Sequence, residues 1–273
     1  MEEKILLVDF MYLWNRIYYA IGQSAGGDYY SHMLEIMKKI SLNTNYSKKY
    51  IILDGLNGTQ RQKSLLSSYK EGRALKTEVY AKISQFIKEC THNYVNLSFL
   101  RANNYEADEV IASLSLKFSK ENKEVFIYSG DKDLLQLLVL PNVNVGMKYT
   151  RLFELQPFTE KDIQKKMDTI SGGVLTRVGD ILKYRIFRGD ASDKIPAAIP
   201  RFPSKIIKEL IDNVWTDVSE LNESILNSMK DYLPEKYSSQ IVKYEKDIIR
   251  NWELMQLQFI PYKEIIRSTN KLS

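Results

Sequence analysis

Three short apolar runs constrain the fold of this 273-residue chain more than any other feature of its sequence. The runs KILLVD, KYIILD and EVFIYSGD are rich in Ile, Val and Leu and do not alternate with polar residues. This pattern is typical of strands buried on both faces of a parallel sheet. Each run ends in an acidic residue, Asp9, Asp54 or Asp131. Because ligands bind beyond the carboxyl ends of such strands, we expect the three acids to converge at one edge.

Helical patterns fill the intervals between these runs. The segments SHMLEIMKKI, KTEVYAKISQFIKEC and EADEVIASLSLKFSKEN predict amphipathic helices, so the first part of the chain is expected to be a wound α/β domain. After about Gly173 only helical patterns continue, and no further strand is expected. The paired glycines of ISGGV break both patterns. We therefore expect an α/β domain over residues 1–172 and a helical lobe over residues 173–273.

The content of cysteine, histidine and apolar residues excludes several classes of protein. One cysteine, Cys90, cannot form an internal disulfide, and with His32 and His92 it supplies too few ligands for structural zinc. No apolar run approaches the roughly 20 residues that span a bilayer, and the acidic start MEEK is unlike a signal peptide. We expect a soluble, intracellular protein that has no contact with a membrane.

Carboxylates gather at the expected strand ends, helix starts and turns. They are Asp9, Asp54, Glu106, Asp108, Glu109, Asp131, Asp133, Asp190 and Asp193. Each fragment alone also fits ordinary structure, since YEADEV suits a helix start, and GDKD and GDASD suit turns. Together, in one partly desolvated cleft, the acids would repel one another unless cations lay among them. Oxygen ligands suit Mg²⁺ or Mn²⁺, and two such ions can activate a water and stabilise the leaving oxygen of a phosphodiester.

The distribution of charge points to a polyanionic partner. The net charge of +5 is modest, but with the nine carboxylates set aside 25 acids remain against 39 Lys and Arg residues, an excess of 14. Basic residues around a metal-filled cleft would bind phosphates with an affinity that falls as salt rises.

Five segments, in this order, carry a resemblance to a known family: LLVDFMYLWNRIYYA, ILDGLNGTQRQKSLLSSYKEGR, YEADEVIASL, YSGDKDLLQLL and RGDASDKIP. They resemble the 5′-3′ exonucleases and flap endonucleases, which include stand-alone phage enzymes and the N-terminal nuclease domain of bacterial DNA polymerase I. The resemblance implies a PIN-like wound sheet, mostly parallel, with a helix-hairpin-helix-like lobe at the C-terminal side. It also implies an arch near residues 73–104 that threads a 5′ single strand.

The resemblance further implies a Mg²⁺-dependent nuclease that cuts DNA, or RNA primers on DNA, near a 5′ flap, nick or free 5′ end. We expect a monomer in the cytoplasm of a bacterium or a phage-infected host, with a single-strand-binding protein or a polymerase as partner. Two Mg²⁺ ions are expected, with Mn²⁺ able to substitute. Two alternatives stay open: another metal-dependent phosphoryl hydrolase, and a nucleic-acid binder without catalysis.

The roles of individual residues follow from the same resemblance. The first ion would be held by Asp9, Asp54, Glu106, Asp108 and Asp131. Glu109, one methylene longer than the family's Asp, would reach an ion through water or with changed geometry. The second ion would be held by Asp133, Asp190 and Asp193. Lys70 would supply charge at the scissile phosphate, and Arg73 would orient that phosphate. The alternative for YKEGR is a solvated basic helix end.

Further residues are expected to contact nucleic acid. In the family's pattern these positions are Arg16, Tyr18, Arg61 and Tyr69, although tyrosines are more often packed in a protein interior. Residues 73–104 are expected to form mostly one helix carrying Lys76, Lys82 and Lys88, which would make a short arch that orders on binding.

One segment departs from the family's pattern. Where the family has a glycine-rich hairpin that grips duplex phosphate, often with K⁺, this chain has KIPAAIPRFPSK. Arg201 and Pro203 replace turn glycines, and proline has no amide to donate while arginine resists a positive φ. This puts the backbone grip and the K⁺ site in doubt. Lys194, Arg201 and Lys205 are expected to substitute side-chain charge.

Overall fold

The computed structural model describes residues 3–21, 28–72, 77–147, 155–217 and 221–267. It divides into two compact units. The first contains residues 1–60, 74–158 and 257–273, and the second contains residues 61–73 and 159–256. Arg73 and Lys76 of the expected site and arch lie outside the described residues.

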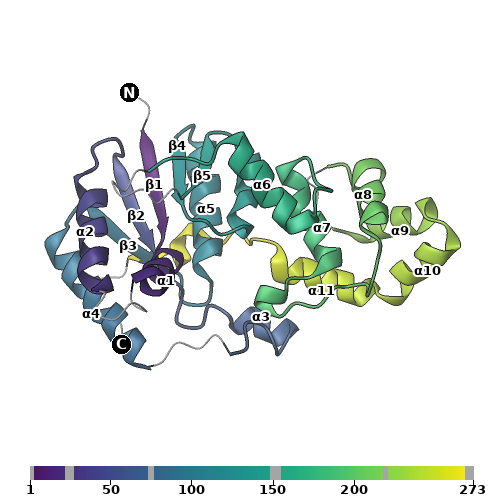
Figure 1. The fold of residues 1–273 in the computed structure, drawn as a ribbon, viewed down its shortest axis with the longest axis horizontal. Helices are drawn as coiled ribbons and strands as arrows, with labels where there is room; N and C mark the ends of the chain where they lie inside the picture. The colour runs from purple at the N-terminus through teal and green to yellow at the C-terminus, as the bar shows by residue number, and fades with distance from the viewer. Residues whose placement is uncertain (1–2, 22–27, 73–76, 148–154, 218–220, 268–273) are drawn as a thin grey trace. The chain divides into compact units, whose positions relative to one another are not determined.

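The first unit is built on a six-stranded sheet, shown in Figure 1, with the strand order β5-β4-β1-β2-β3-β6. Five strands are parallel, and β6 pairs antiparallel with β3. The strands are β1 (Lys4–Asp9), β2 (Lys48–Ile52), β3 (Leu97–Arg101), β4 (Glu124–Tyr128), β5 (Val143–Gly146) and β6 (Ile266–Arg267). The chain places β2 and β3 on one side of β1, then β4 and β5 on the other. The order therefore reverses between β1 and β4, where wound sheets bind ligands.

Helices cover both faces of this sheet because alternate strand residues point in opposite directions. Leu6 and Val8 of β1 belong to one apolar cluster, with α1, α2 and α4, whereas Ile5 and Leu7 belong to another, with α5 and η1. These elements are α1 (Phe10–Ile21), α2 (Tyr29–Leu42), α4 (Thr77–Asn93), α5 (Ala107–Lys120) and η1 (Asp133–Val139). The expected α/β class and its mostly parallel sheet are confirmed.

The second unit is helical. Its elements are α3 (Gln60–Leu65), α6 (Glu160–Ser171), η2 (Val178–Asp180), α7 (Ile181–Arg188), η3 (Ala191–Asp193), α8 (Ser204–Asn213), α9 (Glu223–Tyr232), α10 (Glu235–Lys243) and α11 (Glu245–Met255). The stacked rings of Phe187 and Phe202, 5.8 Å apart, link the end of α7 to the turn before α8. Asn251 on α11 is fully buried and donates to the carbonyls of Ile186 and Pro196.

The chain divides between Phe158 and Thr159 rather than at the expected glycines. Gly172 adopts a φ of 65° and ends α6, so the glycine pair lies inside the second unit. The segment after Gln256 belongs to the first unit, where η4 (Tyr262–Glu264) and β6 lie. There the Ile260 N–H donates to Ser113 Oγ at 2.7 Å.

Residues 77–104 contain the expected helix and, after it, a strand. Helix α4 buries Ile83, Phe86, Ile87 and Cys90 in the core of the first unit, and the residues after it form strand β3. The helix was predicted correctly, but its apolar face packs on the sheet. Strands β3 (LSFLR) and β5 (VNVG) were missed because polar residues interrupt their apolar pattern, and β6 was missed because it has only two residues.

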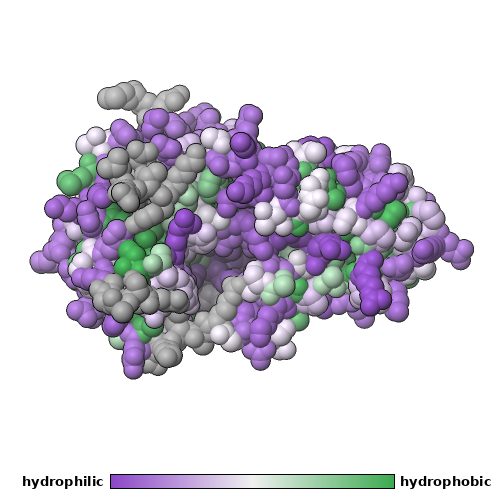
Figure 2. Space-filling view, in the orientation of Figure 1, coloured by the Kyte–Doolittle hydropathy of each residue, from purple (hydrophilic) through white to green (hydrophobic). Residues whose placement is uncertain are grey.

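Apolar side chains on the face drawn in Figure 2 are scattered among hydrophilic ones. Exposed large apolar residues include Tyr19, Leu42, Val95 and Val242, from different helices and loops. Among the described residues, no helix combines the length and apolarity needed to cross a bilayer.

Candidate metal centre

Asp9 lies at the centre of the acidic edge of the first unit. It is the last residue of β1, next to the point where the strand order reverses, and only 8% of its surface is exposed. Its Oδ1 accepts from the Tyr12 N–H at 3.1 Å, and its Oδ2 accepts from Ser129 Oγ at 2.9 Å. These two donors fix the carboxylate at the carboxyl end of the strand.

The surroundings of Asp9 oppose its ionisation. Burial, together with the negative charges of Asp131 and Asp54, raises the pKa of this carboxyl from 3.8 to about 7, against the lowering effect of its two hydrogen bonds. A carboxylate held among other carboxylates in this way is stable in its charged form only when positive charge lies beside it.

The segment after β4 brings Asp131 and Asp133 to the same edge. Fully buried Ser129 accepts from the Asp131 N–H at 3.1 Å while it donates to Asp9. Asp131 Oδ1 in turn accepts from the Asp133 N–H at 3.0 Å, which starts η1. The two aspartates, one residue apart, thus belong to one turn, in which Asp131 accepts from the first residue of the helix that follows.

A second strand end and a helix start supply further carboxylates. Asp54 follows β2, and its Oδ1 accepts from the Ala107 N–H at 2.9 Å, the first residue of α5. Glu106 is the N-cap of α5 and is buried, whereas Asp108 in the first turn is half-buried. Glu109 is buried, and its Oε2 accepts from the Glu106 N–H at 3.0 Å in a capping box. Helix capping therefore accounts for one oxygen of Glu109.

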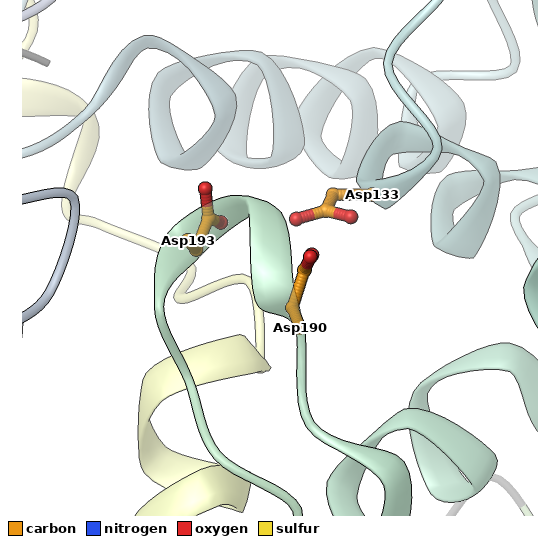
Figure 3. Close-up of side chains that lie close together, drawn as sticks. All are labelled: Asp133, Asp190 and Asp193. Carbon is orange, nitrogen blue, oxygen red and sulfur yellow. The ribbon is translucent and has the colours of Figure 1, made fainter.

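The second unit carries its carboxylates on a tightly closed loop. Asp190 is the N-cap of η3, and Asp193 is its last residue. Their carboxylates offer oxygens within 4.8 Å of each other. Asp190 and Ile195 exchange two backbone hydrogen bonds of 2.8 Å, which close the loop. Gly189 before it has a φ of 71°, and a Cβ there would lie 2.4 Å from the Ile195 carbonyl oxygen. Figure 3 shows both side chains on this loop and Asp133 at the start of η1 in the first unit.

Both oxygens of the Asp190 carboxylate accept hydrogen bonds from residues of the same unit. Its Oδ1 accepts from the N–H of Ser192 at 2.9 Å and from the hydroxyl of Ser192 at 2.6 Å. Its Oδ2 pairs with the guanidinium of Arg185 on α7, and both side chains are 3% exposed.

Lys70 is attached to this loop by its backbone. Its N–H donates to the carbonyl of Asp193 at 3.0 Å, and its φ is 49°. The neighbouring Tyr69 is 4% exposed and packs with Ile195 and Leu254. The ring of Tyr69 is thus part of the core of the second unit, as the packing alternative describes, and it offers no face for stacking on a base.

The other expected phosphate ligands of the second unit are mostly exposed. Lys194 is exposed beside Glu71, 3.4 Å away, and Lys205 is exposed in the first turn of α8. Arg201 is exposed and adopts a φ of 57°, so this turn takes the left-handed conformation that we expected arginine to resist. Pro203 is the N-cap of α8, where it interrupts no helical hydrogen bond. Arg61 donates to the Glu253 carbonyl at 3.0 Å.

Two expected nucleic-acid contacts lie on α1 of the first unit. Arg16 is exposed and hydrogen-bonds the hydroxyl of Tyr12, whose pKa burial raises. Tyr18 is half-buried and meets the rings of Tyr19 and Tyr29 edge-on, with centroids 5.4 Å and 5.1 Å away.

Comparison with known proteins shows the family of this chain. Residues 4–168 match the family described as 5′-3′ exonuclease, N-terminal resolvase-like domain. The chain belongs to the 5′-3′ exonuclease family. A 5′-3′ exonuclease of Mycoplasmopsis pulmonis is 30% identical over 219 residues, covering 78% of this chain and 67% of that protein. Another from Buchnera aphidicola of Schizaphis graminum is 25% identical, covering 83% and 74%.

The fold of this exonuclease-family chain also matches solved structures. The T5 5′-exonuclease with bound divalent metal ions (zinc) aligns with a TM-score of 0.65 and 17% identity, covering 93% of this chain and 90% of that one. At this identity the likeness concerns the fold. The expected PIN-like architecture, mostly parallel and followed by a helical lobe, is confirmed.

The carboxylates of the 5′-3′ exonuclease-family chain fit divalent metal ions. The donor set is made only of oxygens, which hard divalent cations prefer. The pKa of Asp9 is raised by neighbouring carboxylates as well as by burial, and a cation among these acids would relieve that repulsion. Divalent metal binding is therefore consistent with the structure.

Sequence reasoning missed three residues that hold this acidic edge and loop together. They are Ser129, Tyr12 and Arg185. Ser129 did leave a usable signal, because a Ser-Gly pair directly after the run that forms β4 marks a turn. Arg185 gave no signal, because its amphipathic helix is compatible with a basic residue on either face.

Proposed function

We propose that this chain is a structure-selective nuclease that uses two Mg²⁺ ions to hydrolyse phosphodiesters of DNA, or of RNA primers on DNA, near 5′ ends, nicks and flap junctions. One observation carries the proposal. Asp9, whose carboxyl has a pKa raised to about 7, lies buried beside the charges of Asp131 and Asp54 at the reversal point of a sheet that belongs to the 5′-3′ exonuclease family.

The carboxylates form two sets, as the resemblance implies. Asp9, Asp54, Glu106, Asp108 and Asp131 would hold the first ion. Asp133, Asp190 and Asp193 would hold the second, as the resemblance implies. Glu109, which caps α5, would act on an ion only through water. Bound ions would lower the pKa of the attacking water and stabilise the leaving oxygen.

The remaining residues would orient the substrate. Lys70 and Arg73 would bind the scissile phosphate, and the bond from the Lys70 N–H to the Asp193 carbonyl keeps the Lys70 backbone in place when no substrate is bound. Arg16, Tyr18 and Arg61 would contact the strand, and Lys194, Arg201 and Lys205 would contact duplex phosphates by charge. Mn²⁺ would substitute for Mg²⁺, and no role is assigned to K⁺.

Product lengths on matched flap, nicked and single-stranded substrates test the proposal, with Mg²⁺, with Mn²⁺ and with chelator. We expect cleavage at the flap junction that depends on the metal and is lost in the D131N/D133N double variant. Turnover of small phosphomonoesters with no cleavage of flaps would support another phosphoryl hydrolase. Equally poor cleavage by wild type and double variant with both metals would support a binder without catalysis.

A further inference from the structure

Arg185 on α7 is a buried cation whose partner is one of the expected metal ligands. Its side chain is 3% exposed and pairs with the Asp190 carboxylate, which is equally buried. We propose that Arg185 is a positioning residue. It fixes Asp190 before an ion binds and lowers the affinity of the Asp190–Asp193 loop for a divalent ion. The inference rests on the proposed function, because it concerns the ion that Asp190 would help to hold.

The geometry of Asp190 supports the positioning role. Arg185 holds Oδ2, while the N–H and hydroxyl of Ser192 hold Oδ1. Both oxygens therefore have protein partners when no ion is bound, and the carboxylate cannot rotate without breaking a charged hydrogen bond. Because Mg²⁺ usually keeps several of its waters, a carboxylate held in this way can contact the ion through one of them.

The charges support the effect on affinity. Asp190 and Asp193 are both buried and offer oxygens within 4.8 Å of each other, so they repel when both are ionised. An arginine stays charged at every pH at which proteins are folded. The paired Arg185 therefore cancels the charge of Asp190 within the loop, which lessens this repulsion and also lessens the attraction for a divalent ion. The loop can stay folded without metal, at the expense of weaker metal binding.

A second buried ion pair on the same helix provides a matched control. Lys183 and Asp180 are 3% and 6% exposed, and their charged atoms are 3.3 Å apart. Lys183 also donates to the Trp215 carbonyl at 2.6 Å. Removing this lysine also takes a cationic partner from a buried carboxylate, which keeps Arg177 as a second partner at 2.7 Å. That carboxylate lies on η2 and not on the Asp190–Asp193 loop.

Titration of the full chain with Mn²⁺ in the absence of DNA tests the proposal, with free Mn²⁺ measured by electron paramagnetic resonance at pH 8. The Mn²⁺ sites that are present in wild type and absent in D190N are the class of sites to which this loop contributes. R185Q removes the charge but keeps an N–H donor, R185M removes both, and R185K keeps the charge. We expect R185Q and R185M to bind that class on the order of tenfold more tightly than wild type, since a nearby positive charge is gone. R185K and K183M should bind it as wild type does.

Thermal unfolding in chelator gives the second readout. R185Q and R185M should unfold at lower temperature than wild type and should regain more stability on addition of Mn²⁺. If R185M does not fold, R185Q and R185K still separate charge from hydrogen bonding. If R185Q binds Mn²⁺ as tightly as wild type while D190N still lacks the class of sites, the role of Arg185 is overturned and the proposed function is left intact. Identical Mn²⁺ binding in wild type, D190N and D193N overturns both.

Discussion

Ser129 Oγ donates a 2.9 Å hydrogen bond to Asp9 Oδ2 and accepts another from the Asp131 N–H, so one buried hydroxyl joins the ends of β1 and β4. The bond to Asp9 lowers the pKa of that carboxyl, against burial and the neighbouring charges, which raise it. The ends of these two strands are thus coupled by a residue that carries no charge itself.

Replacing Ser129 with alanine should weaken metal binding at the first unit. Without the donor, the pKa of Asp9 rises further, so more of the carboxyl is protonated near neutral pH and the metal must displace that proton. We expect the Mg²⁺ concentration for half-maximal flap cleavage to rise several-fold. S119A is the control, because Ser119 Oγ donates a hydrogen bond of similar kind to the Pro141 carbonyl. An equal shift in both variants would mean that loss of stability, not the Asp9 contact, is responsible.

The D9N variant should be more stable than wild type in chelator at pH 8. The pKa of Asp9 is about 7 in the folded chain against an ordinary 3.8, so the folded state binds this proton more tightly than the unfolded state. The stability it contributes is present below about pH 4 and is lost as the pH rises through about 7. At about 1.4 kcal/mol for each pKa unit, the difference amounts to a few kcal/mol.

Urea unfolding of D9N and wild type at pH 5 and pH 8 measures this effect. The gap between the two proteins should grow with pH, and Mg²⁺ should close it by stabilising only wild type. D231N, which alters an exposed aspartate on α9, should show no such dependence on pH. A gap that is constant with pH would show that Asp9 is ionised without difficulty.

Removing charge at Lys194, Arg201 and Lys205 should weaken binding to flap DNA. These exposed side chains lie at and before the start of α8, and each one that no longer binds a phosphate should reduce the salt dependence of binding by about one counterion. Fluorescence anisotropy with a flap substrate at several salt concentrations gives both the affinity and its slope. A triple change at Lys236, Lys243 and Lys246, all exposed, is the control of equal charge. An equal decrease in both triples would indicate a general effect of net charge.

Changes at Tyr69 should affect stability rather than stacking. Tyr69 is buried against Ile195, Leu254 and Met255, so truncation to alanine should cost about 3 kcal/mol or more of unfolding free energy. Y69F keeps the ring and should stay within about 1 kcal/mol of wild type. Urea unfolding checks both, and single-strand binding is measured in parallel. Normal stability of Y69A with weakened binding would instead favour a stacking role.

Part of this molecule follows from sequence alone. The runs that end in Asp9, Asp54 and Asp131 are continuous apolar segments. Strands of this composition are stable when both faces of their sheet are buried. That condition determined the parallel sheet and the edge on which its acids lie, because all carboxyl ends of parallel strands point the same way. The order of the five motifs indicated the family, which the comparison with known proteins confirmed.

The tertiary structure decided what local patterns do not encode. Tyr69 and Tyr18 are the same residue type, yet one is buried and the other half-buried, because burial depends on packing partners distant in sequence, such as Leu254 for Tyr69. Likewise, only the structure shows that Arg185 pairs with Asp190. Only the pairing of β6 with β3 shows that the chain after Gln256 returns to the sheet. Sequence specifies which segments must be buried and which groups carry charge. Which groups meet is set by long-range packing.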